Sequence, residues 1–221
     1  KILKMKIILL QIDKKKWQLT EQLSDLTLPE IILPKFSLAS KNVRSGNLFS
    51  INGGNIGYSA DELILKNINL FLGGKERIAI YGKNASGKST LLKAILRQDH
   101  LFTTGDWYLP SSEQMGYLDQ HYSNLKPETS VIDHIKTRRP DWSETEARRH
   151  LNDFLFRKNE QVTQLTSHLS GGEKARLSLS MIAAKTPNLL ILDEITNNLD
   201  LVTKEHVIQV LKKFPGAMVV V

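Results

Sequence analysis

The stretch "GKNASGKST" (Gly82–Thr90) constrains the fold of this chain more than any other feature. It fits the pattern G-x-x-x-x-G-K-[ST], whose glycines let the backbone curl until successive N–H groups face phosphate oxygens. An apolar run, "ERIAIYG", precedes it, and "STLLKAILRQ" follows with the 3.6-residue apolar spacing of a helix. A strand before and a helix after are the required context, because the helix N-terminus attracts the same anion. We therefore predict a phosphate loop with the binding residues Gly82, Asn84, Ala85, Ser86, Gly87, Lys88, Ser89 and Thr90.

A second element of the same chemistry lies far downstream, at the end of the apolar run "LLILDE". Lys88 can reach the outer phosphates of a nucleotide, and the Ser89 hydroxyl can hold Mg²⁺. Asp193 would emerge at the carboxyl end of a buried strand and bind the same metal, directly or through water. Glu194 could then accept a proton from an attacking water, or orient it. Adjacent acids at a strand end are also common in plain loops, so this interpretation depends on Lys88 upstream.

The order of the elements indicates an α/β protein with a mainly parallel, covered sheet. From Asn47 short strand patterns with Gly-Gly turns at Gly53–Gly54 and Gly73–Gly74 predict an antiparallel β-subdomain. Residues 121–168 read as an inserted helical subdomain. Within it Ser143 and Glu146 form a capping box, and the helix that they open is expected to bury four side chains. These are Ala147, Leu151, Phe154 and Leu155.

The basic charge is concentrated in residues 1–46, which hold nine Lys or Arg against four Asp or Glu in a chain of net charge +7. A contact with a polyanion and a solvated lysine face both explain this excess. Two prolines and small polar residues make the segment look like a linker. The chain has no cysteine, which excludes disulfides and thiolate metal sites. No apolar run approaches the ~20 residues of a membrane span, so we expect a cytoplasmic protein.

Four motifs follow one another in a telling order: "GKNASGKST", "GYLDQ" ending at Gln120, "LSGGE" from Leu169, and "LLILDE" followed by Leu199–Asp200. With a helical insert between the second and the third, the set resembles the nucleotide-binding domain of ATP-binding-cassette (ABC) proteins. The resemblance covers about residues 47–221. It implies a P-loop ATPase that uses ATP and Mg²⁺ and needs a second cassette, from the same full-length chain or from a homodimer.

The resemblance also implies roles for residues outside the phosphate loop. Tyr58 would stack on adenine, although an ordinary strand aromatic is the alternative. Gln120 would sense Mg²⁺ and the γ-phosphate, with a plain polar loop residue as the alternative, and Asp200 would be the D-loop aspartate that communicates across a dimer. A signature turn would close over the ATP of the partner cassette rather than over its own. It consists of Ser170, Gly171, Gly172 and Glu173.

The finer resemblance is to the ABC-F branch, the twin-cassette ATPases that act on ribosomes and tRNA. It is carried by "LSGGEKARLSL" and by "LDEITNNLD", and residues 1–46 then resemble the linker between two cassettes. An ATPase subunit of a membrane transporter is the first alternative, and a DNA-repair or chromosome-associated cassette is the second. Ala85 replaces a usual glycine, and the family's switch histidine would follow Val221. We therefore expect a C-terminal cassette that is poorly active as this fragment.

Overall fold

The computed structural model describes residues 38–40, 46–98, 100–119, 121–194 and 201–221. The chain divides into a unit Lys1–Leu33 and a unit Pro34–Val221, and every described residue belongs to the second unit. The expectations for the basic segment 1–46, apart from residues 38–40 and 46, and those for Gln120 and Asp200 fall outside these residues. In the part of the chain that is described, no helix combines the length and the apolar character that a bilayer crossing requires.

Three strands form an antiparallel sheet in the order β2-β1-β4: β1 (Asn47–Gly57), β2 (Leu63–Gly73) and β4 (Phe102–Tyr108). The prediction of a turn at Gly53–Gly54 is wrong, because β1 continues through both glycines without reversing direction. Its pairing register shifts there against both neighbours, between Ile51 and Gly54 on one side and between Asn52 and Asn55 on the other. Gly53 has φ +58°, so the pair forms a bulge inside the strand.

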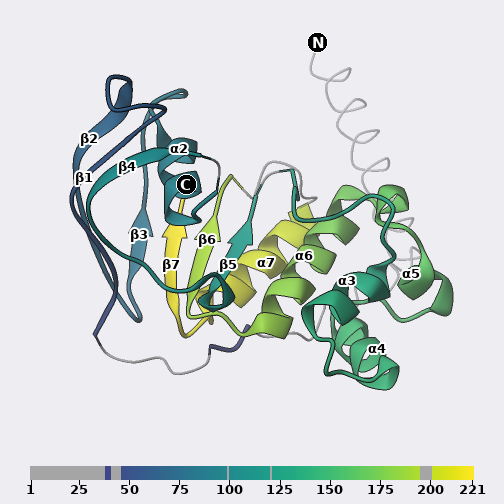
Figure 1. Ribbon diagram of the computed structural model, residues 1–221. Helices are drawn as coiled ribbons and strands as arrows, with labels where there is room; N and C mark the ends of the chain where they lie inside the picture. Colours follow the sequence, from purple (N-terminus) through teal and green to yellow (C-terminus); the bar gives the residue numbers. More distant parts are fainter. Residues whose placement is uncertain (1–37, 41–45, 99, 120, 195–200) are drawn as a thin grey trace, which may run out of the picture. The chain divides into compact units, whose positions relative to one another are not determined.

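The turn predicted at Gly73–Gly74 is present: it joins β2 to β3 (Arg77–Ala79), and the Glu76 N–H donates to the Gly73 carbonyl at 3.2 Å. From β3 a second sheet begins, in which all strands are parallel and lie in the order β3-β7-β6-β5 (Figure 1). Its other strands are β5 (Met115–Leu118), β6 (Leu189–Leu192) and β7 (Ala217–Val220). All four residues of β6 are buried, as the continuous apolar run predicts for a covered parallel strand.

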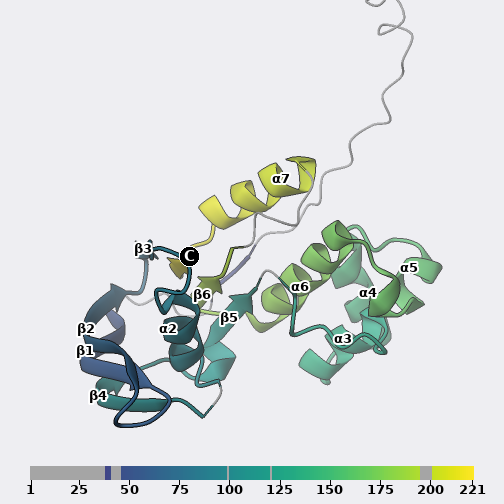
Figure 2. The same cartoon turned by 90° about the horizontal axis from the view of Figure 1, so that it is seen from above.

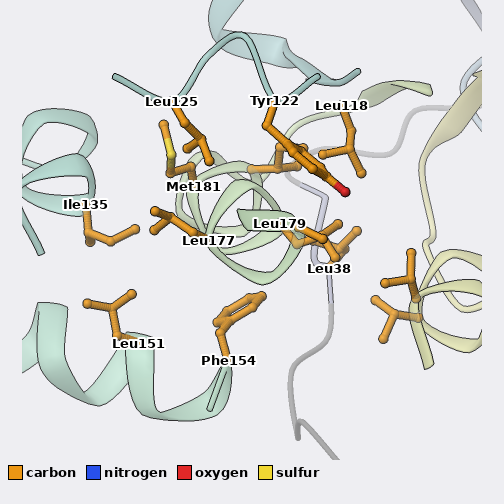
Figure 3. Close-up of a cluster of buried hydrophobic side chains, with 14 of the residues drawn as sticks. Leu38, Leu118, Tyr122, Leu125, Ile135, Leu151, Phe154, Leu177, Leu179 and Met181 are labelled. Atoms are coloured by element: carbon orange, nitrogen blue, oxygen red, sulfur yellow. The ribbon is translucent and has the colours of Figure 1, made fainter. Parts of the chain in front are cut away.

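Side chains that alternate along the parallel strands divide the core into two clusters, one on each face of the sheet. Leu189 and Ile191 pack on one face with α2 (Lys88–Ile95) and with the antiparallel sheet. Leu190 and Leu192 pack on the other face, in a cluster built mainly by helices (Figure 3). That second face is covered by α6 (Gly171–Lys185) and α7 (Leu201–Lys212). The predicted α/β architecture is therefore confirmed.

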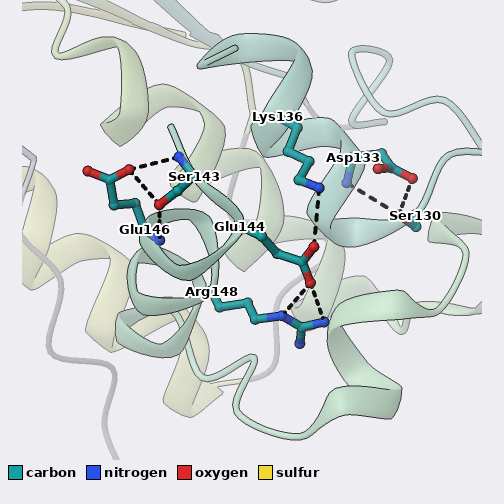
Figure 4. Close-up of polar contacts among 7 residues, drawn as sticks. All are labelled: Ser130, Asp133, Lys136, Ser143, Glu144, Glu146 and Arg148. Carbon is teal, nitrogen blue, oxygen red and sulfur yellow. Dashed lines mark hydrogen bonds and ion pairs between the residues drawn. The ribbon is translucent and has the colours of Figure 1, made fainter. Parts of the chain in front are cut away.

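The inserted helices are α3 (Val131–Arg138), α4 (Glu144–Asp153) and α5 (Asn159–Thr163). The predicted capping box is present at the start of α4: the Ser143 Oγ accepts from the Glu146 N–H at 3.3 Å, and the Glu146 carboxylate accepts from the Ser143 N–H at 2.7 Å (Figure 4). Glu144 binds Lys136 of α3 at 3.4 Å and Arg148 at 2.9 Å. The pair with Lys136 ties α3 to α4, whereas the pair with Arg148 lies within α4. Both pairs are exposed and contribute little stability.

Three of the four predicted core residues of α4 are buried, and Leu155 is the exception. The helix ends at Asp153, and Leu155 adopts a left-handed conformation with φ +66°. The helical period therefore stops before Leu155, and Phe156 takes the buried place instead. A prediction from periodicity alone could not locate this helix end.

The chain just before β1 contributes to the same core. Leu38 is buried in the helical cluster, beside Leu179 and Tyr122 (Figure 3). The Ser40 hydroxyl donates to the Asn188 side-chain oxygen at 2.8 Å, next to the start of β6. Residues 38–40, inside the segment expected to be a linker, are thus attached to the cassette by one apolar and one polar contact.

Candidate nucleotide-binding site

The phosphate loop (Gly82–Thr90) connects the carboxyl end of β3 to α2. The Ile80 N–H donates to the Val220 carbonyl at 2.8 Å, so the chain stays in the sheet until the loop begins. Ala85 and Gly87 have φ of +63° and +90°, and Gly87 is the N-cap of α2. Left-handed positions alternating with right-handed ones turn successive N–H groups toward one concave side, which is the geometry of an anion nest. The predicted loop therefore has the backbone that phosphate binding needs.

Lys88 folds back over its own loop. Its ammonium donates to the carbonyl oxygens of Gly82 and Lys83, both at 3.1 Å. The charge is thereby held inside the curve of the loop, where phosphate oxygens bind in loops of this kind. Ser89 lies exposed in the first turn of α2, so its hydroxyl is accessible to a metal ion or to a phosphate.

Carboxylates gather at the carboxyl edge of the parallel sheet, because the ends of parallel strands meet there. Leu192 pairs with both Leu118 and Val220, so β5, β6 and β7 end side by side. The Asp193 N–H then donates to the Leu118 carbonyl at 2.9 Å and leaves Asp193 next to the end of β5. The carboxylate of Asp119 is close enough to act on that of Asp193.

Burial raises the pKa of Asp193, and the negative charges of Glu194 and Asp119 raise it further. Lys88 lowers this pKa, so the lysine of the phosphate loop and the acid after β6 are electrostatic neighbours. The Tyr117 hydroxyl also donates a hydrogen bond to Asp193, and burial followed by the two aspartates raises the pKa of Tyr117 well above its usual range. The fold therefore brings Lys88 and Asp193 together, as the sequence predicts.

This donor set fits a magnesium ion bound together with a nucleotide. The site contains three carboxylates and one lysine, so it carries an excess of negative charge: Asp119, Asp193, Glu194 and Lys88. Oxygen donors are the ligands that Mg²⁺ prefers. Among the described residues no group of three or more His, Cys, Asp or Glu has the arrangement of a metal site made by protein alone. A site of this class does not require one, because Mg²⁺ commonly keeps several waters and takes phosphate oxygens as ligands.

Glu194 lies one residue beyond Asp193 and is exposed, with φ +48°. Its N–H donates to the Val221 carbonyl at 3.3 Å, which fixes the backbone at the ends of β6 and β7. A left-handed glutamate costs about 1–2 kcal/mol relative to an ordinary conformation. Strain of this kind concentrates at functional sites, and it turns the chain sharply at the place predicted for the catalytic acid.

Tyr58 follows β1, and its side chain is 64% exposed. Its N–H donates to the Glu62 carbonyl at 3.1 Å and closes the β1–β2 hairpin. On β2, Ile64 and Leu65 lie so close to Gly87 that a Cβ on this glycine would meet them at 3.3 and 3.0 Å. The hairpin that carries Tyr58 thus adjoins the phosphate loop, and the stacking of this exposed aromatic on adenine stays a prediction.

Three residues of this edge, Tyr81, Tyr117 and Asp119, were not among the site residues predicted from the motifs. Tyr81 directly precedes the phosphate loop and is 91% exposed. Tyr117 and Asp119 lie two residues apart at the end of β5, and both act on Asp193. An available signal was their position: each follows or ends an apolar strand pattern at the edge where ligands of parallel sheets bind.

The signature turn (Ser170–Glu173) opens α6 with a complete capping box. The Ser170 Oγ accepts from the Glu173 N–H at 3.3 Å, and the Glu173 carboxylate accepts from the Ser170 N–H at 2.9 Å. This turn belongs to the helices of one face of the parallel sheet, whereas α2 lies on the other face (Figures 1 and 2). The two glycine turns predicted from the sequence are therefore parts of different layers.

The phosphate loop, the parallel sheet and Asp193 at its carboxyl edge define a P-loop nucleotide-binding domain. The family model described as "ABC transporter" matches residues 65–197, more than half of the chain. This chain belongs to that family, as an ATP-binding ABC ATPase domain that resembles ABC-F cassettes.

Two curated relatives are similar over most of this chain. The Haemophilus influenzae protein named "Probable ATP-binding protein YheS" is 40% identical over 170 residues, which cover 76% of this chain and 26% of that protein. The "ATP-binding protein Uup" of Buchnera aphidicola is 30% identical over 221 residues, which cover 98% of this chain and 35% of that protein. The chain thus spans about a quarter to a third of the length of these relatives.

A solved structure titled "Structure of ATP binding subunit of ABC transporter" superposes with a TM-score of 0.66 at 21% identity. The match covers 78% of each chain. At this identity the likeness confirms the fold alone.

Proposed function

We propose that this chain is one cassette of an ABC-F ATPase that hydrolyses ATP together with a second cassette and acts on the ribosome and its tRNA. The observation that carries the two-cassette part is the separation of the phosphate loop and the signature turn across the parallel sheet. A turn in another layer cannot easily close over the nucleotide of its own chain. An equivalent turn from a second cassette can complete the site, with its helix N-terminus directed at the phosphate.

In this proposal each residue at the carboxyl edge has one task. The amides of the phosphate loop and the Lys88 ammonium hold the phosphates, and Tyr58 stacks on adenine. Ser89 and Asp193 hold Mg²⁺, which neutralises charge on the phosphates when it is bound. Glu194 orients the attacking water or accepts its proton. Gln120 and Asp200 keep the roles that the resemblance implies, the first toward Mg²⁺ and the second across the dimer.

The ribosome part is supported by the motifs "LSGGEKARL" and "LDEITNNLD" and by the basic excess of residues 1–46. Electrostatic attraction between such a segment and RNA phosphates is strong at low salt. The likeness to transporter subunits shows the fold alone, so it does not favour a membrane partner.

The test uses the full-length protein with Glu194→Gln, which removes the proton acceptor and keeps the shape of the side chain. With ATP this variant should sediment with ribosomes, because the closed pair of cassettes cannot reopen by hydrolysis. Glu205→Gln is the control, since Glu205 is exposed on α7 and its substitution changes the charge equally. Absence of ribosome binding by the ATP-bound trap would overturn the ribosome role.

The two-cassette requirement has its own test. This fragment should be monomeric without ATP and should turn over ATP poorly. Hydrolysis is measured as phosphate release, and sedimentation establishes that the protein is monomeric under the same conditions. Rapid hydrolysis by the monomer would contradict a site shared between two cassettes. The outcome is independent of ribosome binding, so the two parts of the proposal can fail separately.

A further inference from the structure

Two adjoining cavities of about 190 and 330 Å³ form a cleft with mixed polar and apolar walls beside β5, the edge strand of the parallel sheet. We call it the β5-edge cleft. Arg138 and Lys185 line both cavities, and no residue of the phosphate loop lines either one. Other polar side chains also line the walls: Gln98, Ser112, Gln114, Asn124, Thr186 and Asn188. The smaller cavity has apolar walls as well, from Leu96, Met115, Met181 and Ile182, and it is also lined by Tyr117. The larger cavity alone reaches the lower end of the size range of small-ligand sites, about 300 Å³.

Arg138 is the unusual residue of this cleft. It is half-buried in the last turn of α3, and among the described residues it has neither a hydrogen bond nor an ion pair. Its neighbour Arg139 is fully engaged: it binds the Asp141 carboxylate at 2.8 and 2.6 Å and donates to the Ala184 carbonyl at 3.1 Å. A half-buried guanidinium whose donors have no partner among the described residues can bind an anion that enters the cleft.

Lys185, at the end of α6, adds a second cation that is only weakly compensated. Its side chain is 15% exposed, and it pairs at 3.3 Å with Glu113, whose side chain is 78% exposed. The charged residues that line the cleft are three cations and one carboxylate. A helix C-terminus stabilises a nearby cation, which explains why Arg138 and Lys185 stand in last turns. It does not explain why both face the same two cavities.

We propose that the β5-edge cleft binds a phosphate group. The planar Arg138 guanidinium can bind two phosphate oxygens at once, and Lys185 contributes a point charge. The Ser112 hydroxyl and the side-chain amides of Gln98 and Asn124 can donate to the remaining oxygens. The phosphate is assigned to the backbone of an RNA strand, an assignment that rests on the proposed ribosome function. A free phosphate ion offers the same chemistry and is separated from RNA by the test.

The test compares Arg138→Gln with Arg149→Gln in the full-length protein. Arg149 is exposed on α4, has no hydrogen bond or ion pair among the described residues, and lines neither cavity, so its substitution removes the same charge elsewhere. Affinity for a fluorescent single-stranded RNA oligonucleotide is measured by anisotropy at several salt concentrations. Loss of one phosphate contact should reduce the slope of log K against log salt by about 0.7 for Arg138→Gln, and Arg149→Gln should leave the slope unchanged.

Inorganic phosphate is the second probe. If it raises the melting temperature of the parent and of Arg149→Gln but not of Arg138→Gln, while RNA binding is equal in all three, the cleft binds free phosphate and the RNA assignment is overturned. If neither probe distinguishes Arg138→Gln from Arg149→Gln, the phosphate site itself is overturned. Equal melting temperatures of the two variants without ligand establish that both are folded.

Ribosome sedimentation of the Glu194→Gln protein separates this inference from the proposed function. If the Glu194→Gln protein binds ribosomes but neither probe distinguishes Arg138→Gln, the proposed function is supported and the phosphate site in the cleft is overturned. If the Glu194→Gln protein does not bind ribosomes but the stabilisation by inorganic phosphate still depends on Arg138, the ribosome function is overturned and the phosphate site is supported.

Discussion

Replacement of Gly87 by alanine tests whether the backbone of the phosphate loop, rather than its side chains, creates the site. Gly87 is the N-cap of α2 and has φ +90°. An added Cβ would lie 3.0 Å from Leu65 and 3.3 Å from Ile64 on β2. The substitution therefore places a methyl group between the hairpin of Tyr58 and the start of the helix.

Two costs determine the size of the effect. An L-residue held in the left-handed region costs about 1–2 kcal/mol. The contacts with Leu65 and Ile64 are tight, but these side chains are only partly buried or exposed and can shift at small cost. We expect a loss of about 1–2 kcal/mol, which lowers the melting temperature by about 2–8 °C in a chain of this size. If the loop relaxes by rotating its amides away from the concave side, nucleotide affinity falls at least tenfold, about 1.4 kcal/mol.

Gly53→Ala is the matched control. Gly53 also has positive φ, +58°, but a Cβ there would meet nothing within 4 Å, and the residue belongs to the bulge of β1. It should cost similar backbone strain without affecting nucleotide binding. Melting temperature and affinity for a fluorescent ATP analogue are measured for both variants. Unchanged ATP affinity in Gly87→Ala, or an equal loss in both variants, would refute the argument that the loop backbone makes the site.

Three further predictions concern charge and capping. Because the pKa of Asp193 is raised in the fold, its protonated carboxyl contributes stability that is fully present below about pH 4 and is lost as the pH rises through the raised pKa. At pH 7 Asp193→Asn should therefore raise the melting temperature without ligand. The same substitution should abolish the increase in unfolding free energy of about 2.7 kcal/mol that is expected from Mg-ATP at 100 times Kd. An unchanged stabilisation by Mg-ATP would contradict the metal role. Glu173→Ala and Glu146→Ala should each lower the midpoint of urea unfolding, since each breaks an equivalent capping box, and a loss in only one would show that the boxes differ. Burial lowers the pKa of His150, so its neutral form stabilises the fold above about pH 6.5, and this stability is lost as the pH falls. The melting temperature should therefore depend less on pH in His150→Leu. An identical pH profile of the two proteins would contradict this prediction.

Much of the fold could be predicted because strong local signals agree with one another. The apolar run of β6, the helix spacing of α2 and the capping box at Ser143 each determine an element with little help from distant contacts. The errors lie where a local signal has two physical solutions. A Gly-Gly pair permits either a turn or a bulge, and only the pairing of both halves of β1 with the same two strands decides for the bulge.

The candidate site was predictable in its motifs but not in its neighbours. Lys88 and Asp193 follow from the phosphate loop and from the end of an apolar strand. The effects of Tyr117 and Asp119 on the pKa of Asp193 depend on the order of β5 and β6 in the sheet, which no pattern within either strand specifies. The burial of Leu38 likewise depends on contacts with α6, far along the chain.

The signature turn explains why two glycines and a glutamate stand together at the start of α6. Ser170 and Glu173 satisfy each other's N–H groups, and the Lys174 N–H donates to the Ser170 carbonyl at 2.9 Å. Among the described residues this leaves the Gly171 and Gly172 N–H groups as the first-turn amides that have no capping partner. The Glu173 carboxylate is turned back onto Ser170, so its charge need not face an incoming anion. We therefore expect the two glycine amides, which no side chain covers, to contact the phosphate of a second cassette, whereas the glutamate holds the turn in shape.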